Sequence, residues 1–267
     1  MWQASRILTR SQQLVAWVGA VSLLLLCGLG CSSKSKRPSS LAPLSAPGWR
    51  MELPVKDFGP ATVALPLGAT GPRPIVVVVH GARDRAQWQC GSFRGVLGGH
   101  VFILCPQGIA QSAEGGLYGL GSFDDSAAEL RAALAALKAR FGAYVAPSPV
   151  LLIGYAEGAA VAADLARQEP AFFARVALVN GNPARLTPSA AKIFAERGGK
   201  RVLFFCAEAE CDASGVERAL LLTRAGVAAK SVKAEVGPYL DQRFTDALRG
   251  QVPWLVEGDT RWGRSSR

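Results

Sequence analysis

Histidine is scarce in this chain, and the residues that commonly build metal or nucleic-acid sites are poorly arranged for either purpose. Only two histidines occur, His80 and His100. None of the six cysteines stands in a C-x2-C pair, the spacing typical of structural zinc sites. The formal net charge is +10, but the basic residues are scattered without interleaved aromatics. We therefore expect no metal, no cofactor and no nucleic-acid partner.

The first 31 residues have the composition of an export signal. Arg6 and Arg10 give a positive start, residues 14–30 form a 17-residue run without charge, and small residues precede Cys31. This pattern resembles the bacterial lipobox, although Gly28 departs from the branched aliphatic residue preferred three positions before the cysteine. We interpret residues 1–31 as a lipoprotein signal peptide with Cys31 as the lipidation site.

Two alternatives stay open for this segment. Cys27 is a rival lipidation site, although the preceding Leu26 is bulky for the usual cleavage pocket. The other alternative is an uncleaved transmembrane anchor, and the uncharged run is just short of the ~20 residues that span a bilayer. Either interpretation places the rest of the chain outside the cytoplasm. With a palmitate or similar acyl chain on Cys31, we expect a lipoprotein of the bacterial cell envelope, on the periplasmic or outer-surface side, whose partner is the lipid bilayer.

The segment after the signal differs in composition from the remainder of the chain. Residues 32–50 are rich in Ser, Pro and Lys and show no apolar periodicity, which predicts a flexible tether. Residues 51–267 suffice for one sizeable core but not for two comfortable α/β domains. We therefore expect a single domain there.

Four cysteines remain once Cys27 and Cys31 are assigned to the signal. An even number in an oxidising compartment suggests two disulfides. We pair Cys90 with Cys105, which ends a predicted strand, and Cys206 with Cys211 across a short loop. Three connectivities are possible, and the sequence alone does not choose among them.

Apolar runs and helical patterns alternate along residues 75–249. The β-branched run 75–79 and the run 101–105 predict strands buried on both faces. Residues 124–141 predict an amphipathic helix with acids in its first turn and Gly142 just past its end. Further strands are expected at 176–179, 202–206 and 231–236, with helices near 190–196, 215–225 and 244–249. Strands separated by such helices pair in parallel, so we predict an α/β fold: a doubly wound, mostly parallel sheet with helices on both faces.

A strand, a sharp turn and a helix occupy residues 150–166. The turn reads Gly154-Tyr155-Ala156-Glu157-Gly158, which has the spacing of the nucleophile elbow G-x-S-x-G with alanine at its centre. We call residues 154–158 the elbow. Its small residues fit a strained turn in which the helix packs close to the sheet. Alanine can hold that turn, but its methyl group cannot attack a carbonyl.

In these features the chain resembles the α/β-hydrolase superfamily, in particular the small esterase-like members related to dienelactone hydrolases and carboxylesterases. The resemblance covers roughly residues 60–256. It includes a strand ending in His80-Gly81, the elbow, an acidic loop at residues 206–212, and a glycine-bearing loop after the strand that ends at Val236. The resemblance implies backbone donors of an oxyanion hole at Gly81-Ala82 and at Glu157.

The resemblance also implies where a catalytic base would stand. The chain reads Gly237-Pro238-Tyr239 there, so Pro238 replaces the expected histidine. In the family, His80 would be a structural residue of its turn. His100 precedes its strand and so falls at the end of a parallel sheet that does not carry the site.

The acidic loop holds three candidates for the family's acid position, Glu208, Glu210 and Asp212. Without a histidine they have nothing to orient. The alternative that we favour is a polar loop whose Asp212 lies at a helix N-terminus.

These observations lead us to expect an α/β-hydrolase-like protein with a vacant catalytic centre. Its expected role is to bind a small-molecule ligand or an envelope partner in a preformed pocket. The pocket residues would be Gly81, Ala82, Tyr155, Ala156, Glu157, Pro238 and Tyr239. A hydrolase that activates water with Glu157 or the acidic loop is the first alternative, and a structural envelope protein is the second.

Overall fold

The computed structural model describes residues 40–111, 116–182 and 186–263. The predicted signal peptide and Cys31 lie outside these residues. The described residues belong to one compact unit that begins at Ser40. No helix among them is both long enough and apolar enough to cross a bilayer.

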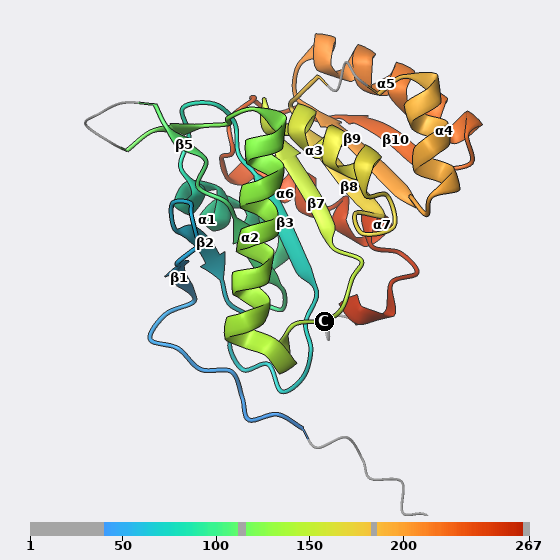
Figure 1. Cartoon of the computed structure of the whole chain (residues 1–267). Coiled ribbons are helices and arrows are strands. Elements are labelled where there is room, and N and C mark those ends of the chain that lie inside the picture. Colours follow the sequence, from blue (N-terminus) through green and yellow to red (C-terminus); the bar gives the residue numbers. More distant parts are fainter. Residues whose placement is uncertain (1–39, 112–115, 183–185, 264–267) are drawn as a thin grey trace, which may run out of the picture. The chain divides into compact units, whose positions relative to one another are not determined.

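An eight-stranded sheet forms the centre of this domain, in the order β1-β2-β4-β3-β7-β8-β9-β10 (Figure 1). The first two strands run antiparallel to their neighbours, and the others pair in parallel. In that order the strands are Arg50–Leu53, Ala61–Ala64, Phe102–Cys105, Ile75–Val79, Leu151–Tyr155, Arg175–Val179, Arg201–Cys206 and Ala228–Lys233. The mostly parallel sheet confirms the predicted fold class.

Helices cover both faces of the sheet. One face packs against α2 (Phe123–Phe141), α3 (Gly158–Gln168), α4 (Pro188–Glu196) and α5 (Ala209–Arg224). The other face packs against α1 (Ala86–Leu97), α6 (Gln242–Arg249) and α7 (Val252–Leu255). In Figure 1, α2 and α3 lie in front of the sheet and α6 lies behind it.

Strand β3 shows why a continuous apolar run is needed here. Ile75, Val77 and Val79 belong to the core under α2 and α3. Val76 and Val78 belong to the core on the opposite face. Successive side chains of a strand point to opposite faces, so a strand covered by helices on both sides must be apolar at every position.

Several elements match the sequence expectations closely. The predicted strand at 75–79 is β3, and the predicted helix at 124–141 is α2. Ser122 and Asp125 form a reciprocal capping box at the start of α2, and Gly142 follows its end. Such a cap satisfies two backbone donors that a helix N-terminus otherwise leaves without partners.

Other elements begin or end elsewhere than predicted. Helix α5 begins at Ala209, so Glu210 and Asp212 lie in its first turn and not in a loop. Strand β10 ends at Lys233, three residues before the predicted end. The sequence analysis missed β1, β2, α1 and the short hairpin of β5 (Ile109–Ala110) and β6 (Tyr118–Gly119).

Part of the predicted tether belongs to the folded domain. Leu44 is buried, and its amide donates to the Ala69 carbonyl over 2.9 Å. The hydroxyl of Tyr144 donates to the Ala42 carbonyl over 2.8 Å. These contacts anchor residues that lack periodicity of their own, because single apolar side chains can dock on a core that other elements have built.

Candidate functional site

Ala156 stands at the turn between β7 and α3, at the carboxyl edge of the parallel strands. Its φ is 50°, in the left-handed region that residues other than glycine seldom adopt. The Ala156 amide donates to the Val179 carbonyl over 2.9 Å, and its carbonyl accepts from the Ala159 amide over 3.0 Å. The strained geometry expected of a nucleophile elbow is therefore present, with a methyl group at its centre.

Glycines around the elbow are required by close backbone contacts. A Cβ atom added at Gly158 would lie 2.3 Å from the Val79 carbonyl oxygen. One added at Gly154 would lie 2.3 Å from the Gly158 carbonyl oxygen. Gly181, which follows β8, approaches the elbow as closely, with 2.3 Å between an added Cβ and the Ala156 carbonyl oxygen. The sequence signal of small residues thus has a steric cause.

Glu157 reaches back across the elbow to the loop after β3. Its Oε2 atom accepts a hydrogen bond from the Ala82 amide over 3.1 Å. A Cβ atom added at Gly81 would lie 3.0 Å from the Ala156 methyl and 3.0 Å from Glu157 Oε2. The structure therefore brings together four of the predicted site residues, Gly81, Ala82, Ala156 and Glu157.

His80 is almost fully buried beneath this loop, with 1% of its surface exposed. Its Nδ1 lies 2.6 Å from the Gly81 carbonyl oxygen, and its Nε2 lies 2.9 Å from the Gln107 carbonyl oxygen. The buried carboxylate of Glu129 accepts from the amides of Gln107 and Gly108 over 2.8 and 3.0 Å. The His80 side chain thus links the turn that follows β3 to the turn that follows β4.

His100 lies before β4, at the amino edge of the parallel strands. Its ring meets Trp262 edge to face, with 5.9 Å between the centroids. Burial, together with the positive charge of Arg73, lowers the pKa of His100. The position agrees with the expectation that this histidine takes no part in an elbow site.

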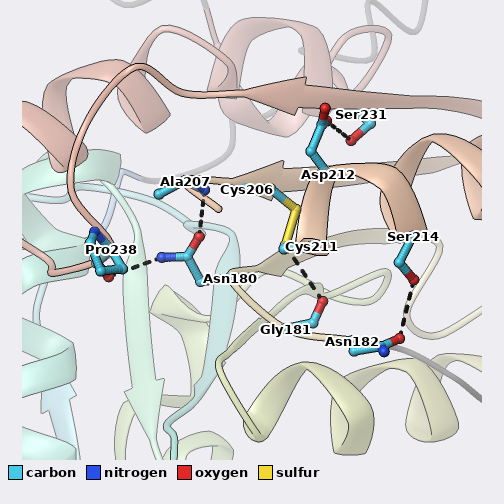
Figure 2. The surroundings of a disulfide bond; sticks show 10 residues. All are labelled: Asn180, Gly181, Asn182, Cys206, Ala207, Cys211, Asp212, Ser214, Ser231 and Pro238. Atoms are coloured by element: carbon cyan, nitrogen blue, oxygen red, sulfur yellow. Dashed lines mark hydrogen bonds between the residues drawn. A yellow bond between two sulfur atoms is a disulfide. The ribbon is translucent and has the colours of Figure 1, made fainter. Parts of the chain in front are cut away.

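Pro238 occupies the loop after β10, and its carbonyl oxygen is a shared acceptor. The Tyr155 hydroxyl and the Asn180 Nδ2 each donate to it over 2.9 Å. Asn180 Oδ1 in turn accepts from the Ala207 amide over 2.8 Å, as Figure 2 shows. The sequence analysis missed Asn180, although its place directly after a buried parallel strand was a usable signal.

Tyr155 keeps its proton in this environment. Burial is the main cause that raises the pKa of its phenol, and the negative charges of Asp84, Glu157 and Glu208 add to the rise. A hydrogen bond with Asn180 acts in the opposite direction. The neutral phenol is the state that donates to Pro238, so it is a structural donor and not a nucleophile at neutral pH.

The acidic candidates do not converge on one point. Glu208 and Glu210 are exposed. Asp212 Oδ1 accepts from Ser231 Oγ over 2.9 Å, which ties the first turn of α5 to β10 (Figure 2). Asp212 therefore lies at a helix N-terminus, as we favoured, although the helix begins earlier than expected.

Both expected cysteine pairs lie at disulfide distance. Cys90 and Cys105 have an S–S distance of 2.17 Å, and Cys206 and Cys211 have one of 2.02 Å. The second pair joins the end of β9 to the first turn of α5, beside the Asn180 contacts (Figure 2).

The residues expected to line a pocket at this edge differ in exposure, from the buried Gly81 to the exposed Ala82 and Glu157. Tyr239, named as a pocket residue, is 77% exposed and lies on the surface. A small cavity lies beside the end of β3, and its walls include Val79, His80, Pro106, Gly108 and Glu129. Ala156, Glu157 and Pro238 do not line that cavity. Across the described residues, no group of three or more His, Cys, Asp or Glu side chains is placed to hold a metal ion.

Comparison with known proteins identifies the fold. No protein-family model and no curated protein matches the sequence. Among solved structures, the chain is similar to Est1E from Butyrivibrio proteoclasticus, with 12% identity, a TM-score of 0.54, and 78% of this chain and 99% of that chain covered. It is also similar to an S-formylglutathione hydrolase from Agrobacterium tumefaciens, with 14% identity and a TM-score of 0.55; the match covers 78% of this chain and 94% of that chain. A third similar structure is the Bacillus cereus carboxylesterase, with 15% identity and a TM-score of 0.53; the match covers 73% of this chain and 93% of that chain. The chain has the α/β-hydrolase fold.

Proposed function

We propose that this protein is an exported, lipid-anchored α/β-hydrolase-like binding protein that holds a small ligand or a segment of an envelope partner at its elbow without turnover. The observation that carries the proposal is the left-handed conformation of Ala156, with φ of 50°, at the centre of the elbow. The scaffold keeps the strained turn that presents a nucleophile, yet presents a methyl group.

The loop after β10 supports the same proposal. A serine hydrolase needs a base that accepts the proton of the nucleophile. The group fixed near Tyr155 and Asn180 is the backbone carbonyl of Pro238, which already accepts two hydrogen bonds and has negligible basicity. Loss of triad members lowers turnover by about a millionfold in a well-studied serine protease. We therefore assign binding, and not hydrolysis, to the elbow.

Export and anchoring are inferred from the first 31 residues and from the cysteines. Disulfide pairing of Cys90 with Cys105 and of Cys206 with Cys211 suits an oxidising compartment such as the periplasm or the outer surface. Metabolic labelling with palmitate tests the anchor in a bacterial host. Label should enter the parent chain and a Cys27→Ser variant, whereas the Cys31→Ser variant should stay unlabelled.

Ligand-dependent thermal unfolding tests the binding role. A compound that binds only the folded state raises the unfolding midpoint by mass action. Compounds that do so should also shift the amide resonances of Gly81, Ala82 and Glu157 in the chain that lacks residues 1–31. Midpoint shifts that map to another surface would contradict binding at the elbow, and ester turnover at this site would contradict the absence of catalysis.

A further inference from the structure

We propose that Glu157 sets the ligand specificity of the elbow: its carboxylate occupies the backbone donor of Ala82, so the site rejects carboxylates and carbonyl compounds and favours uncharged or cationic ligands that donate hydrogen bonds. This inference rests on the proposed binding function and names the ligand class for the same site.

The contact between the two residues carries the argument. The Ala82 amide donates to Glu157 Oε2 over 3.1 Å. The Ala156 methyl and the same carboxylate oxygen both lie 3.0 Å from the position of a Cβ atom on Gly81. The methyl, the carboxylate and the Ala82 amide therefore lie close together beside Gly81. A carbonyl oxygen bound against Ala156 would compete with Glu157 for that amide.

Neighbouring donors are also engaged within the chain. The Tyr155 hydroxyl and the Asn180 Nδ2 both donate to the Pro238 carbonyl. The Ala207 amide donates to Asn180 Oδ1. An acceptor that approached any of these donors would thus have to break an internal hydrogen bond, whereas Glu157 Oε1 offers acceptor capacity to an incoming donor.

The charges near Tyr155 also favour cationic over anionic ligands. The negative charges of Asp84, Glu157 and Glu208 all act on the Tyr155 hydroxyl. These charges disfavour an anion beside the Tyr155 hydroxyl, even though the whole chain carries a formal net charge of +10.

Amide NMR on the chain lacking residues 1–31 tests this assignment, with butyrate and butylammonium as matched probes. Glu157→Ala removes the carboxylate and frees the Ala82 amide. Glu157→Gln removes the charge but keeps an acceptor. Glu210→Ala is the control, because it removes an exposed carboxylate from the first turn of α5.

We expect butyrate to bind Glu157→Ala at least tenfold more tightly than the parent, with the Ala82 resonance reporting the binding. The butyrate affinity of Glu157→Gln should lie between those of the parent and Glu157→Ala, and that of Glu210→Ala should equal the parent's.

Equal butyrate affinity in the parent, Glu157→Ala and Glu210→Ala would overturn the assignment, as would no butyrate binding to any of them. These outcomes leave the proposed function standing, because its own failure is recognised separately, by ester turnover or by ligand shifts that map elsewhere.

Discussion

Asn180 donates a hydrogen bond from Nδ2 to the carbonyl oxygen of Pro238 over 2.9 Å. Because its Oδ1 accepts from the Ala207 amide, one side chain joins the end of β8 to the segments that follow β9 and β10. Asn180 has a φ of 47°, a conformation that asparagine tolerates better than most residues. The chain thus fixes the three segments that frame the elbow with one half-buried amide.

Replacing Asn180 with alanine should destabilise the domain. The variant loses the hydrogen bonds to the Pro238 carbonyl and from the Ala207 amide, leaves that amide without its acceptor, and places alanine in a left-handed conformation. We expect a loss of about 2 kcal/mol in the free energy of unfolding, measured by urea denaturation. Asn182→Ala, which removes one exposed contact with Ser214, should change it by less than about 0.5 kcal/mol. Equal effects of the two variants would show that Asn180 has no special role.

The close approach of helix α3 to the sheet makes Gly158 indispensable. A methyl group there would lie 2.3 Å from the Val79 carbonyl oxygen, and neither backbone can yield without moving the helix. We expect Gly158→Ala to cost about 3 kcal/mol of stability, at the upper end of common overpacking penalties.

Gly91→Ala is the matched control for Gly158→Ala. Gly91 lies within α1, and an added Cβ atom would have no heavy atom within 4 Å. Alanine there should raise the thermal midpoint slightly, because it lowers the entropy of the unfolded chain and favours the helix by up to about 1 kcal/mol. A similar fall in both variants would contradict the steric account of the elbow.

Asp259 gives the domain a stability that depends on pH. Burial acts to raise the pKa of its carboxyl, but the hydrogen bonds and charge of Arg261 outweigh burial, and the pKa is lowered. The ionised form is therefore favoured in the folded state. This contribution is present above the unfolded pKa of about 4 and is lost as the pH falls through the lower folded value.

Urea unfolding at pH 7 and at pH 3 measures that contribution. The difference in unfolding free energy between the two pH values should be smaller in Asp259→Asn than in the parent. Glu235→Gln removes an exposed carboxylate and should keep the parent's difference. An unchanged difference in Asp259→Asn would show that its titration is not linked to folding.

The fold and much of the elbow were predictable because their signals are local. The run 75–79 has to be apolar throughout in a sheet covered on both faces, and residues 154–158 carry the small residues that a tight turn needs. The contacts of Asn180 and Glu157 were not predictable, since each depends on a residue at least 27 positions away. Residues 40–50 were mistaken for tether because their order comes from docking on Ala69 and Tyr144, which no periodicity reveals.

Restoring the nucleophile and the base should restore ester hydrolysis if the scaffold keeps hydrolase geometry. Ala156→Ser with Pro238→His should hydrolyse short esters measurably, whereas either single change should give far less, because nucleophile and base act as a unit. Adding Glu157→Ala should raise the rate further by freeing the Ala82 amide. No gain from the double variant would mean that the loop after β10 no longer reaches the elbow.

Hydrolysis of p-nitrophenyl butyrate by the chain lacking residues 1–31 tests the central claim most directly. The account predicts a rate equal to the buffer background, and the same background rate for Glu157→Ala. Clear turnover by the parent that disappears in Glu157→Ala would contradict the account, and would identify Glu157 as the base of a hydrolase that uses no serine.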